Sequence, residues 1–225
     1  MSYEFDFAPV VERLPYLLQG AGLTLLIAFA AFWIGAVIGV AGALGKTYGA
    51  SWQRRLVNAY VVFVTNTPAL VQVFFLFYGL PAIGVVLSPL VAVMTGLALN
   101  AGAYLTEIIR GGIAAVRRHE LEAAEALGLS RAQAVWHVML PHVLQTVYGP
   151  LTNFFVMLVL GSSMAALFGV EELTGRALNV STTDLRTLET FGVVALVYVL
   201  LTVLASLALA AVGRTVFKLR LKWIA

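Results

Sequence analysis

Five apolar stretches, each long enough to cross a bilayer as a helix, constrain this chain more than any other feature. A hydrocarbon core of about 30 Å requires about 20 helical residues. Windows of that length select Gly20 to Leu44, Val57 to Leu80, Pro89 to Ile109, Val147 to Val170 and Thr190 to Gly213. Only 11% of the residues are charged, against about 25% in soluble domains. Because a lone segment in lipid must bond its own backbone groups, we expect an all-α, polytopic membrane protein with five transmembrane helices.

The distribution of lysine and arginine predicts how these helices are oriented. Of the 14 basic residues, 11 fall between segments one and two, between three and four, or after segment five. Such an excess marks the cytoplasmic side, so the N-terminus is expected outside and the C-terminus in the cytoplasm. We therefore divide the chain into an extracytoplasmic segment 1–19, one transmembrane domain 20–213 with a cytoplasmic loop 110–146, and a basic cytoplasmic tail 214–225. No basic stretch opens the chain, so no cleaved signal is expected.

One cytoplasmic stretch, "HELEAAEALGLSRAQAVWHVMLP" (119–141), carries charges in a chain that otherwise has few. Residues 119–127 are good helix formers, and Gly128 follows where a left-handed C-terminal cap belongs. A capping box at 130–133 then opens a second helix, which Pro141 breaks or kinks. The spacing alone fits either an amphipathic connector on the membrane surface or a smooth helix that docks in a partner's groove.

Three motifs resemble one known family. Glu122, Ala123, Ala124 and Gly128 look like the EAA loop of ATP-binding-cassette importer permeases. Together with "NTPALVQVFFLFYGLP" (66–81) and "AYLTEIIRGGI" (103–113), that loop resembles the polar amino acid branch, the histidine, glutamate and glutamine group. Where this branch has a Lys-Asp/Asn-Thr-Ser-Leu pattern, residues 160–164 read Leu-Gly-Ser-Ser-Met, so the charge of the substrate is not carried over.

The resemblance implies a type I importer permease in the bacterial cytoplasmic membrane. It implies ATPase coupling through Glu122, Ala123, Ala124 and Gly128. The expected partners are a second, identical or homologous permease subunit, two ATP-binding-cassette ATPase subunits, an extracytoplasmic solute-binding protein and an amino-acid substrate. ATP and Mg would be held by the partner ATPase, with no cofactor on this chain. The alternative function is a self-sufficient secondary carrier or channel for a small polar solute.

Polar residues within the apolar segments are the candidates for a substrate path. Burying them in lipid is unfavourable unless they are paired or hydrated. An unwound turn or a proline kink is expected at Pro68. Each candidate makes either an interhelical hydrogen bond or a contact with a polar solute. The candidates are Asn66, Thr67, Gln72, Asn100, Asn153, Ser162 and Ser163.

Two further charged groups have open interpretations. Glu107 and Arg110 are three residues apart and can pair on one helix face, as a structural contact or a gate. The loop 171–189 has a net negative charge and fits either a binding protein with basic patches or a plain solvated loop.

No enzyme chemistry is expected from the sequence. Cysteine is absent, and no histidine spacing suits a metal. "VAGALGKT" (40–47) lacks the first glycine of a phosphate-binding loop and ends an apolar span instead of following a strand. We therefore expect no catalytic residue and no metal ligand.

Overall fold

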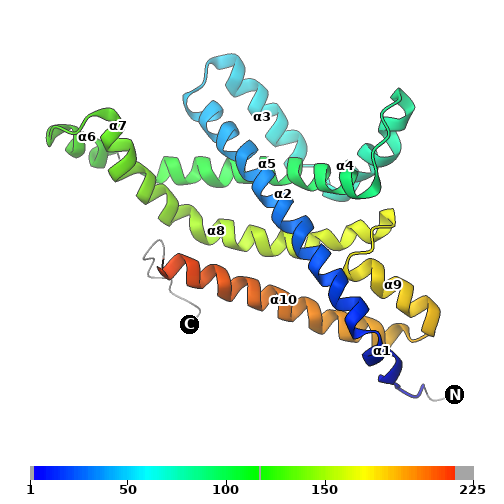
Figure 1. The fold of residues 1–225 in the computed structure, drawn as a ribbon. Helices are drawn as coiled ribbons and strands as arrows, with labels where there is room; N and C mark the ends of the chain where they lie inside the picture. The colour runs from blue at the N-terminus through cyan, green and yellow to red at the C-terminus, as the bar shows by residue number, and fades with distance from the viewer. Residues whose placement is uncertain (1–2, 117, 216–225) are drawn as a thin grey trace. The chain divides into compact units, whose positions relative to one another are not determined.

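The computed structural model describes residues 3–116 and 118–215, and this part of the chain is helical without strands (Figure 1). The α-helices are α1 (Ala8–Glu12), α2 (Leu14–Tyr48), α3 (Ser51–Thr65), α4 (Ala69–Phe74), α5 (Pro89–Ala115), α6 (Arg118–Ala126), α7 (Arg131–Ala134), α8 (Leu140–Gly161), α9 (Leu173–Asp184) and α10 (Thr187–Thr215). Two π-helical segments, η1 (Phe75–Gly79) and η3 (Val135–Met139), and two 3₁₀ segments, η2 (Leu80–Ile83) and η4 (Ser162–Phe168), continue these helices. The all-α prediction is confirmed.

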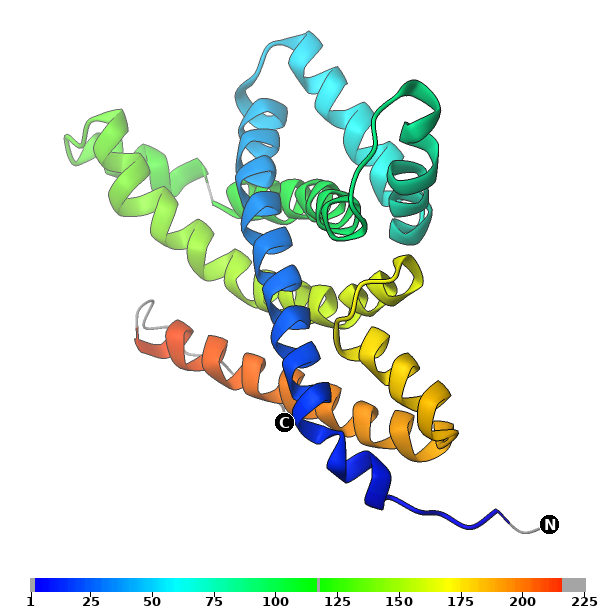
Figure 2. The ribbon, with the colours of Figure 1, turned by 45° about the vertical axis from the view of Figure 1, so that its right-hand side comes forward.

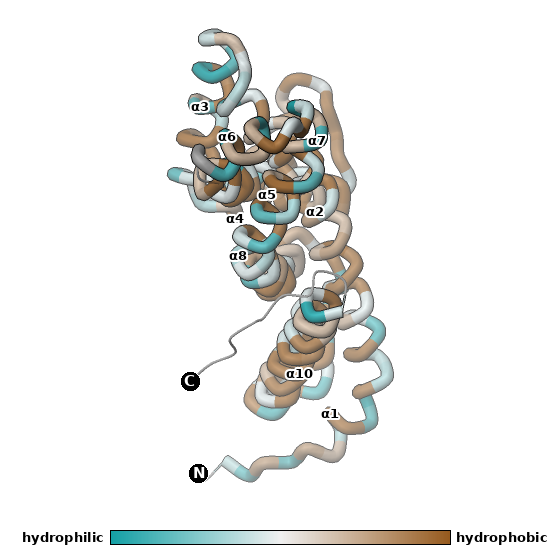
Figure 3. The backbone as a smooth tube through the Cα atoms, turned by 90° about the vertical axis from the view of Figure 1, so that its left-hand side faces the viewer, coloured by the Kyte–Doolittle hydropathy of each residue, from teal (hydrophilic) through white to brown (hydrophobic). Residues whose placement is uncertain are grey.

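Four described helices are long and apolar enough to cross a membrane: Leu14–Tyr48, Pro89–Ala115, Arg131–Phe168 and Thr187–Thr215. A fifth span results if α3 and the stretch Ala69–Ile83 are counted as one broken segment. The long helices consist largely of apolar residues, and α2 runs without a break from Leu14 to Tyr48 (Figures 2 and 3). The helices extend beyond the predicted segments at several ends; α2 begins inside the predicted segment 1–19. The orientation stays a prediction, and most of the predicted tail lies outside the described residues.

The second predicted segment is interrupted at 66–68. Pro68 has extended backbone angles and precedes α4, so the expected unwound turn is present. The side chains just before it bond carbonyl groups in the last turn of α3, in addition to the backbone bond from the Asn66 N–H to Val62 O at 3.2 Å. Thr65 Oγ1 donates to Val61 O at 2.8 Å, and Asn66 Nδ2 donates to Val62 O at 2.8 Å. These side-chain bonds stabilise the break.

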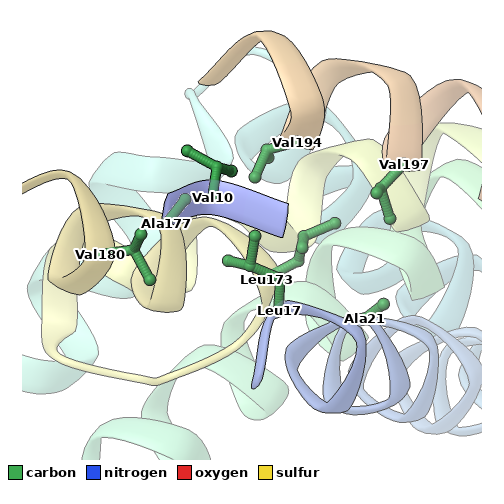
Figure 4. Packing of buried hydrophobic residues seen from close by; sticks show 8 residues of the cluster. All are labelled: Val10, Leu17, Ala21, Leu173, Ala177, Val180, Val194 and Val197. Carbon is green, nitrogen blue, oxygen red and sulfur yellow. The ribbon is translucent and has the colours of Figure 1, made fainter. Parts of the chain in front are cut away.

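The described chain forms two compact units. The first takes residues 3–33, Pro68–Ala98 and Phe155–Ala205. Its core joins residues from α1, α2, α9 and α10 (Figure 4). The buried members are Val10, Leu17, Ala21, Leu173, Ala177, Val180, Val194 and Val197.

The second unit takes Ile34–Thr67, Leu99–Phe154 and residues 206–215. Here the backbones of α2 and α5 approach closely at small residues. A Cβ on Gly39 would lie 2.6 Å from Leu105 Cβ, and one on Gly102 would lie 2.5 Å from Ile38 Cγ2. Such contacts allow helices to associate in lipid, where the hydrophobic effect between helices is weak.

Candidate functional site

The helix α6 and its C-terminal cap form the first candidate site. Gly128 has φ +80°, a left-handed conformation that favours glycine. The Gly128 N–H donates to Glu125 O at 2.9 Å, and the Leu129 N–H donates to Ala124 O at 3.1 Å. These two bonds are the pair of a Schellman cap. The helix therefore ends where the sequence predicts.

A capping box connects this helix end to α7. Ser130 N–H donates to Gln133 Oε1 at 2.8 Å, and the Gln133 N–H donates to Ser130 Oγ at 3.4 Å. Pro141 does not end the helix: the π-helical segment Val135–Met139 precedes it, and α8 continues to Gly161. A wider turn just before the proline fits its missing N–H and bulky ring. Of the two predicted alternatives at Pro141, the break is therefore wrong, and the kink stays a prediction.

The surface of α6 is largely exposed. Ala124 is buried, at 3% exposure, so its face of α6 packs against other residues of the protein. Glu122, Ala123 and Gly128 are exposed, and Leu127 is 83% exposed. Of the four predicted coupling residues, three are thus accessible and one anchors the helix.

The predicted pair Glu107 and Arg110 is part of a larger ionic group. Arg110 Nη2 lies 2.8 Å and its Nε 3.0 Å from Glu107 Oε2. Lys46, in the last turn of α2, places its Nζ 2.6 Å from Glu107 Oε1. One carboxylate thus connects the last turn of α2 with α5, in the second unit.

Several predicted path residues bond their own helix backbone. Thr67 Oγ1 donates to Phe63 O at 2.9 Å. Ser162 Oγ and Ser163 Oγ donate to Val159 O and Leu160 O, at 2.8 and 2.7 Å. Polar side chains can bond carbonyl groups of the preceding turn in this way, and the role of these residues in a substrate path stays a prediction.

The remaining path candidates are distributed over both units. Asn100 is buried at 9% exposure, Gln72 is half-buried, and Asn153 is exposed. Gln72, Ser162 and Ser163 belong to the first unit, whereas Asn66, Thr67, Asn100 and Asn153 belong to the second. Their role in a substrate path stays a prediction.

Glu172 is the most enclosed ionisable group outside the spanning helices, at 0% exposure. Its Oε2 accepts from Thr24 Oγ1 at 2.9 Å and from Tyr198 OH at 3.0 Å, and its Oε1 accepts from Gly175 N–H at 2.9 Å. Burial raises the pKa of Glu172, and the hydrogen bonds from Thr174, Gly175, Thr24 and Tyr198 oppose that rise. The carboxyl group also caps α9.

Part of the predicted acidic loop is not available at the surface. Glu172 and Glu189 are both 0% exposed. Glu189 Oε2 accepts from Tyr3 OH at 2.5 Å and its Oε1 from Asp6 N–H at 3.1 Å. These two carboxyl groups therefore fit neither predicted alternative, because a buried group neither docks a partner nor lies in solvent.

Residues 33–218 match the family described as binding-protein-dependent transport system inner membrane component. The chain belongs to this family. The probable amino-acid ABC transporter permease YckA of Bacillus subtilis is 36% identical over 78% of each chain. The glutamine transport system permease GlnP of Escherichia coli is 30% identical, covering 94% of this chain and 97% of its own.

The fold of this inner membrane component also matches solved structures. A crystal structure of an amino acid ABC transporter with histidines has a TM-score of 0.88 and 30% identity, covering 94% of this chain and 99% of its own. An inward-facing structure of the MetNI methionine ABC transporter has a TM-score of 0.70 at 19% identity, which supports the fold alone.

Two groups in this inner membrane component escaped the sequence interpretation. Lys46 is linked to no site by its place in the sequence, and its contact with Glu107 joins residues 61 positions apart. Glu172 was interpreted as a surface charge. Glutamate is not among the preferred N-cap residues, so its capping role is visible only in the structure. Thr24 and Tyr198 are too distant in sequence to be linked to it by spacing.

Proposed function

We propose that this chain is the transmembrane permease subunit of an ATP-driven amino-acid importer. It forms the translocation path with a second permease subunit, identical or homologous, and receives solute from an extracytoplasmic binding protein. Two separate ATPase subunits bind ATP and Mg and hydrolyse the ATP, so this chain is not an enzyme. Its amino-acid relatives support the substrate class, and its apolar helices and family support a location in the bacterial inner membrane.

The observation that carries the proposal is the construction of α6. The helix is fixed by a buried Ala124 and by the Schellman cap at Gly128, yet Glu122 and Ala123 are exposed. A short helix with small exposed side chains can enter a groove on a partner. In this proposal the groove belongs to an ATPase subunit.

Because α6 is held firmly, movement of the ATPase subunits is passed on to the permease. When ATP closes the two ATPase subunits, each carries its docked α6, and the permeases rock between inward-open and outward-open states. The helical run 131–161 that begins after the capping box transmits the movement. We also propose that the pair Glu107 and Arg110 gates the path.

The substitution Gly128→Asp tests the coupling role. An aspartate at φ +80° strains the backbone and adds a charge next to the exposed face of α6. We expect uptake to fall at least tenfold, with the permease still inserted in the membrane but no longer copurifying with its ATPase. The measurements are radiolabelled amino-acid uptake and copurification from membranes in which the neighbouring genes are coexpressed.

Gly84 provides a matched control. It has φ +83°, and, like Gly128, a Cβ there would meet nothing within 4 Å. Gly84→Asp introduces the same strain and charge away from α6, and uptake should stay within about twofold of the parent. Uptake that persists in Gly128→Asp, or that continues in nucleotide-free vesicles, would instead identify a secondary carrier or channel.

A further inference from the structure

One face of α8 differs from the exposed faces of the other long helices. Gln145, Gly149 and Asn153 are exposed and follow one another at four-residue spacing, so they form a row on one side of the helix. In contrast, the large exposed side chains in the middle of α10 are all apolar: Leu196, Val199, Leu200, Val203, Leu204 and Leu207. A row of leucine and valine suits lipid, whereas two carboxamides do not.

The chemistry of the α8 row argues against lipid at Asn153, which lies inside the predicted spanning segment 147–170, whereas Gln145 lies at the end of the predicted cytoplasmic loop 110–146. Within the described chain, the amide groups of Gln145 and Asn153 have no hydrogen-bond partner. An unpaired amide in hydrocarbon costs several kcal/mol, about 4–8 on transfer to an alkane. The next exposed residue in the row, Met157, is apolar, so the polar part spans about 12 Å at 1.5 Å per residue.

The backbone along the same row is also polar and open. Pro150 lies inside α8 and has no N–H, so the carbonyl of Thr146 loses its usual helical donor. A Cβ on Gly149 would meet no atom within 4 Å outside its own helix backbone, so the space beside this turn of α8 is open. Freed backbone groups at membrane depth are tolerated where they line a water-filled cavity or contact protein.

We propose that the row Gln145–Gly149–Asn153, which we name the α8 polar row, lines a water-filled part of the solute path. The row starts near the N-terminal end of α8, the end nearer in sequence to the coupling helix α6. It extends from there into the spanning segment. This inference rests on the proposed function, because it assigns a wall of that permease's path. Asn153 thereby gains a structural context, and Gln145 is a new path residue.

The α8 polar row indicates the kind of solute that it contacts. No aspartate, glutamate, lysine or arginine occurs between residues 132 and 170. Amides and a carbonyl group can accept from an ammonium group and, for the amides, donate to a carboxylate, without favouring a net charge. The row therefore suits a zwitterionic amino acid with an uncharged side chain.

Cysteine accessibility tests the proposal directly, since the chain has no cysteine of its own. Single variants Gln145→Cys, Gly149→Cys and Asn153→Cys are compared with Leu196→Cys and Val203→Cys on α10. The full complex in permeabilised membrane vesicles is treated with the water-soluble thiol reagent 2-(trimethylammonium)ethyl methanethiosulfonate. A thiol must ionise to react, so only hydrated positions are modified quickly.

We expect the three α8 thiols to react at least tenfold faster than the two α10 thiols. We also expect the neutral zwitterion glutamine to slow the reaction of the thiol at position 153 more than arginine or glutamate does. Rates equal to those of α10 would overturn the proposal. Slow modification combined with oxidant-induced cross-linking between two copies would also overturn it, because the row would then be a dry permease–permease contact.

A glutamine effect no larger than that of the charged amino acids would reject the substrate class. The labelling needs no nucleotide, so rapid modification in a protein that binds no ATPase would contradict the proposed function while leaving the water-filled wall intact.

Discussion

The two units of this permease stabilise a carboxylate in opposite ways. In the first unit, Glu172 is fully buried and accepts only from uncharged donors, including Thr24 Oγ1 and Tyr198 OH. In the second unit, Glu107 has a side chain that is 33% exposed and lies between the cations Lys46 and Arg110. Uncharged donors bond the first carboxyl group, which has little solvent around it, whereas the second carboxyl group has both counter-ions and partial solvent.

This difference predicts different costs on removal. A buried group with satisfied hydrogen bonds leaves each of its partners unsatisfied when it is deleted. A partly exposed ion pair is screened by water and salt, and its partners regain solvent when it is lost. The Glu172 cluster should therefore matter mainly for stability, and the Glu107 cluster should have a smaller effect.

The largest effect is expected for Glu172→Ala. The change leaves Thr24, Tyr198 and the Gly175 N–H without their acceptor and removes the cap of α9. We expect a loss of about 3 kcal/mol in the free energy of unfolding, since one unsatisfied buried donor costs about 1–3 kcal/mol. Urea or thermal unfolding in detergent micelles, followed by tryptophan fluorescence, measures it.

The neighbouring residue gives a matched control. Glu171 is exposed, and its carboxylate accepts from Tyr16 OH at 3.4 Å and from Asn179 Nδ2 at 3.2 Å. Glu171→Ala should change stability by no more than about 0.5 kcal/mol, as is usual for surface positions. Equal losses in the two variants would show that burial does not distinguish them.

A smaller effect is expected in the Glu107 cluster. Lys46→Met and Glu107→Gln remove the 2.6 Å contact that links α2 to α5. We expect a coupling energy of about 0.5–1 kcal/mol in a double-mutant cycle, within the range for contacting residues but reduced by solvent screening. Unfolding of the two single variants and the double variant at low salt provides the cycle.

High salt offers a control within the same experiment. In about 1 M salt the Debye length falls to about 3 Å, so the coupling energy between Lys46 and Glu107 should shrink. The effect of Glu172→Ala should stay nearly unchanged, because its partners carry no charge. A Lys46–Glu107 coupling that does not respond to salt would contradict the ionic interpretation.

The features that sequence predicted here are local or depend on composition. The apolar segments, the cap at Gly128, the capping box at Ser130 and the break before Pro68 each depend on residues within a few positions of one another. The Glu107–Arg110 pair is also local. Long-range contacts such as Lys46 to Glu107 or Glu172 to Thr24 depend on packing between helices, for which one sequence carries no spacing rule.

Helix–backbone bonding limited the interpretation of single polar residues. Ser162 and Ser163 bond carbonyl groups of the preceding turn, and Thr67 bonds the carbonyl of Phe63 in α3, so a polar side chain in an apolar segment does not by itself mark a solute path. Gln145 lies just before the predicted segment that starts at Val147, and its exposure on a spanning helix is visible only in three dimensions. Accessibility in the fold therefore separates path candidates better than polarity alone.

The sharpest test of the comparison is the pH dependence of Glu172. Burial raises its pKa in the folded state above the ordinary value of 4.5. Above pH 4.5 the unfolded chain loses this proton while the folded chain retains it, so the unfolded state gains stability. The contribution of Glu172 is complete below pH 4.5, decreases as the pH rises toward the folded pKa, and is lost above it.

Glu172→Gln isolates this contribution, because glutamine has a similar shape and an acceptor oxygen but does not ionise. The difference in unfolding free energy between parent and Glu172→Gln should shift in favour of the variant as the pH rises from 4.5 to 8, by about 1.4 kcal/mol for each unit by which the pKa is raised. Melting curves of both proteins across that range measure the shift. A difference that stays constant with pH would mean that the hydrogen bonds from Thr24, Tyr198 and Gly175 fully offset burial, and that a carboxylate can be held without a cation at no cost to its ionisation.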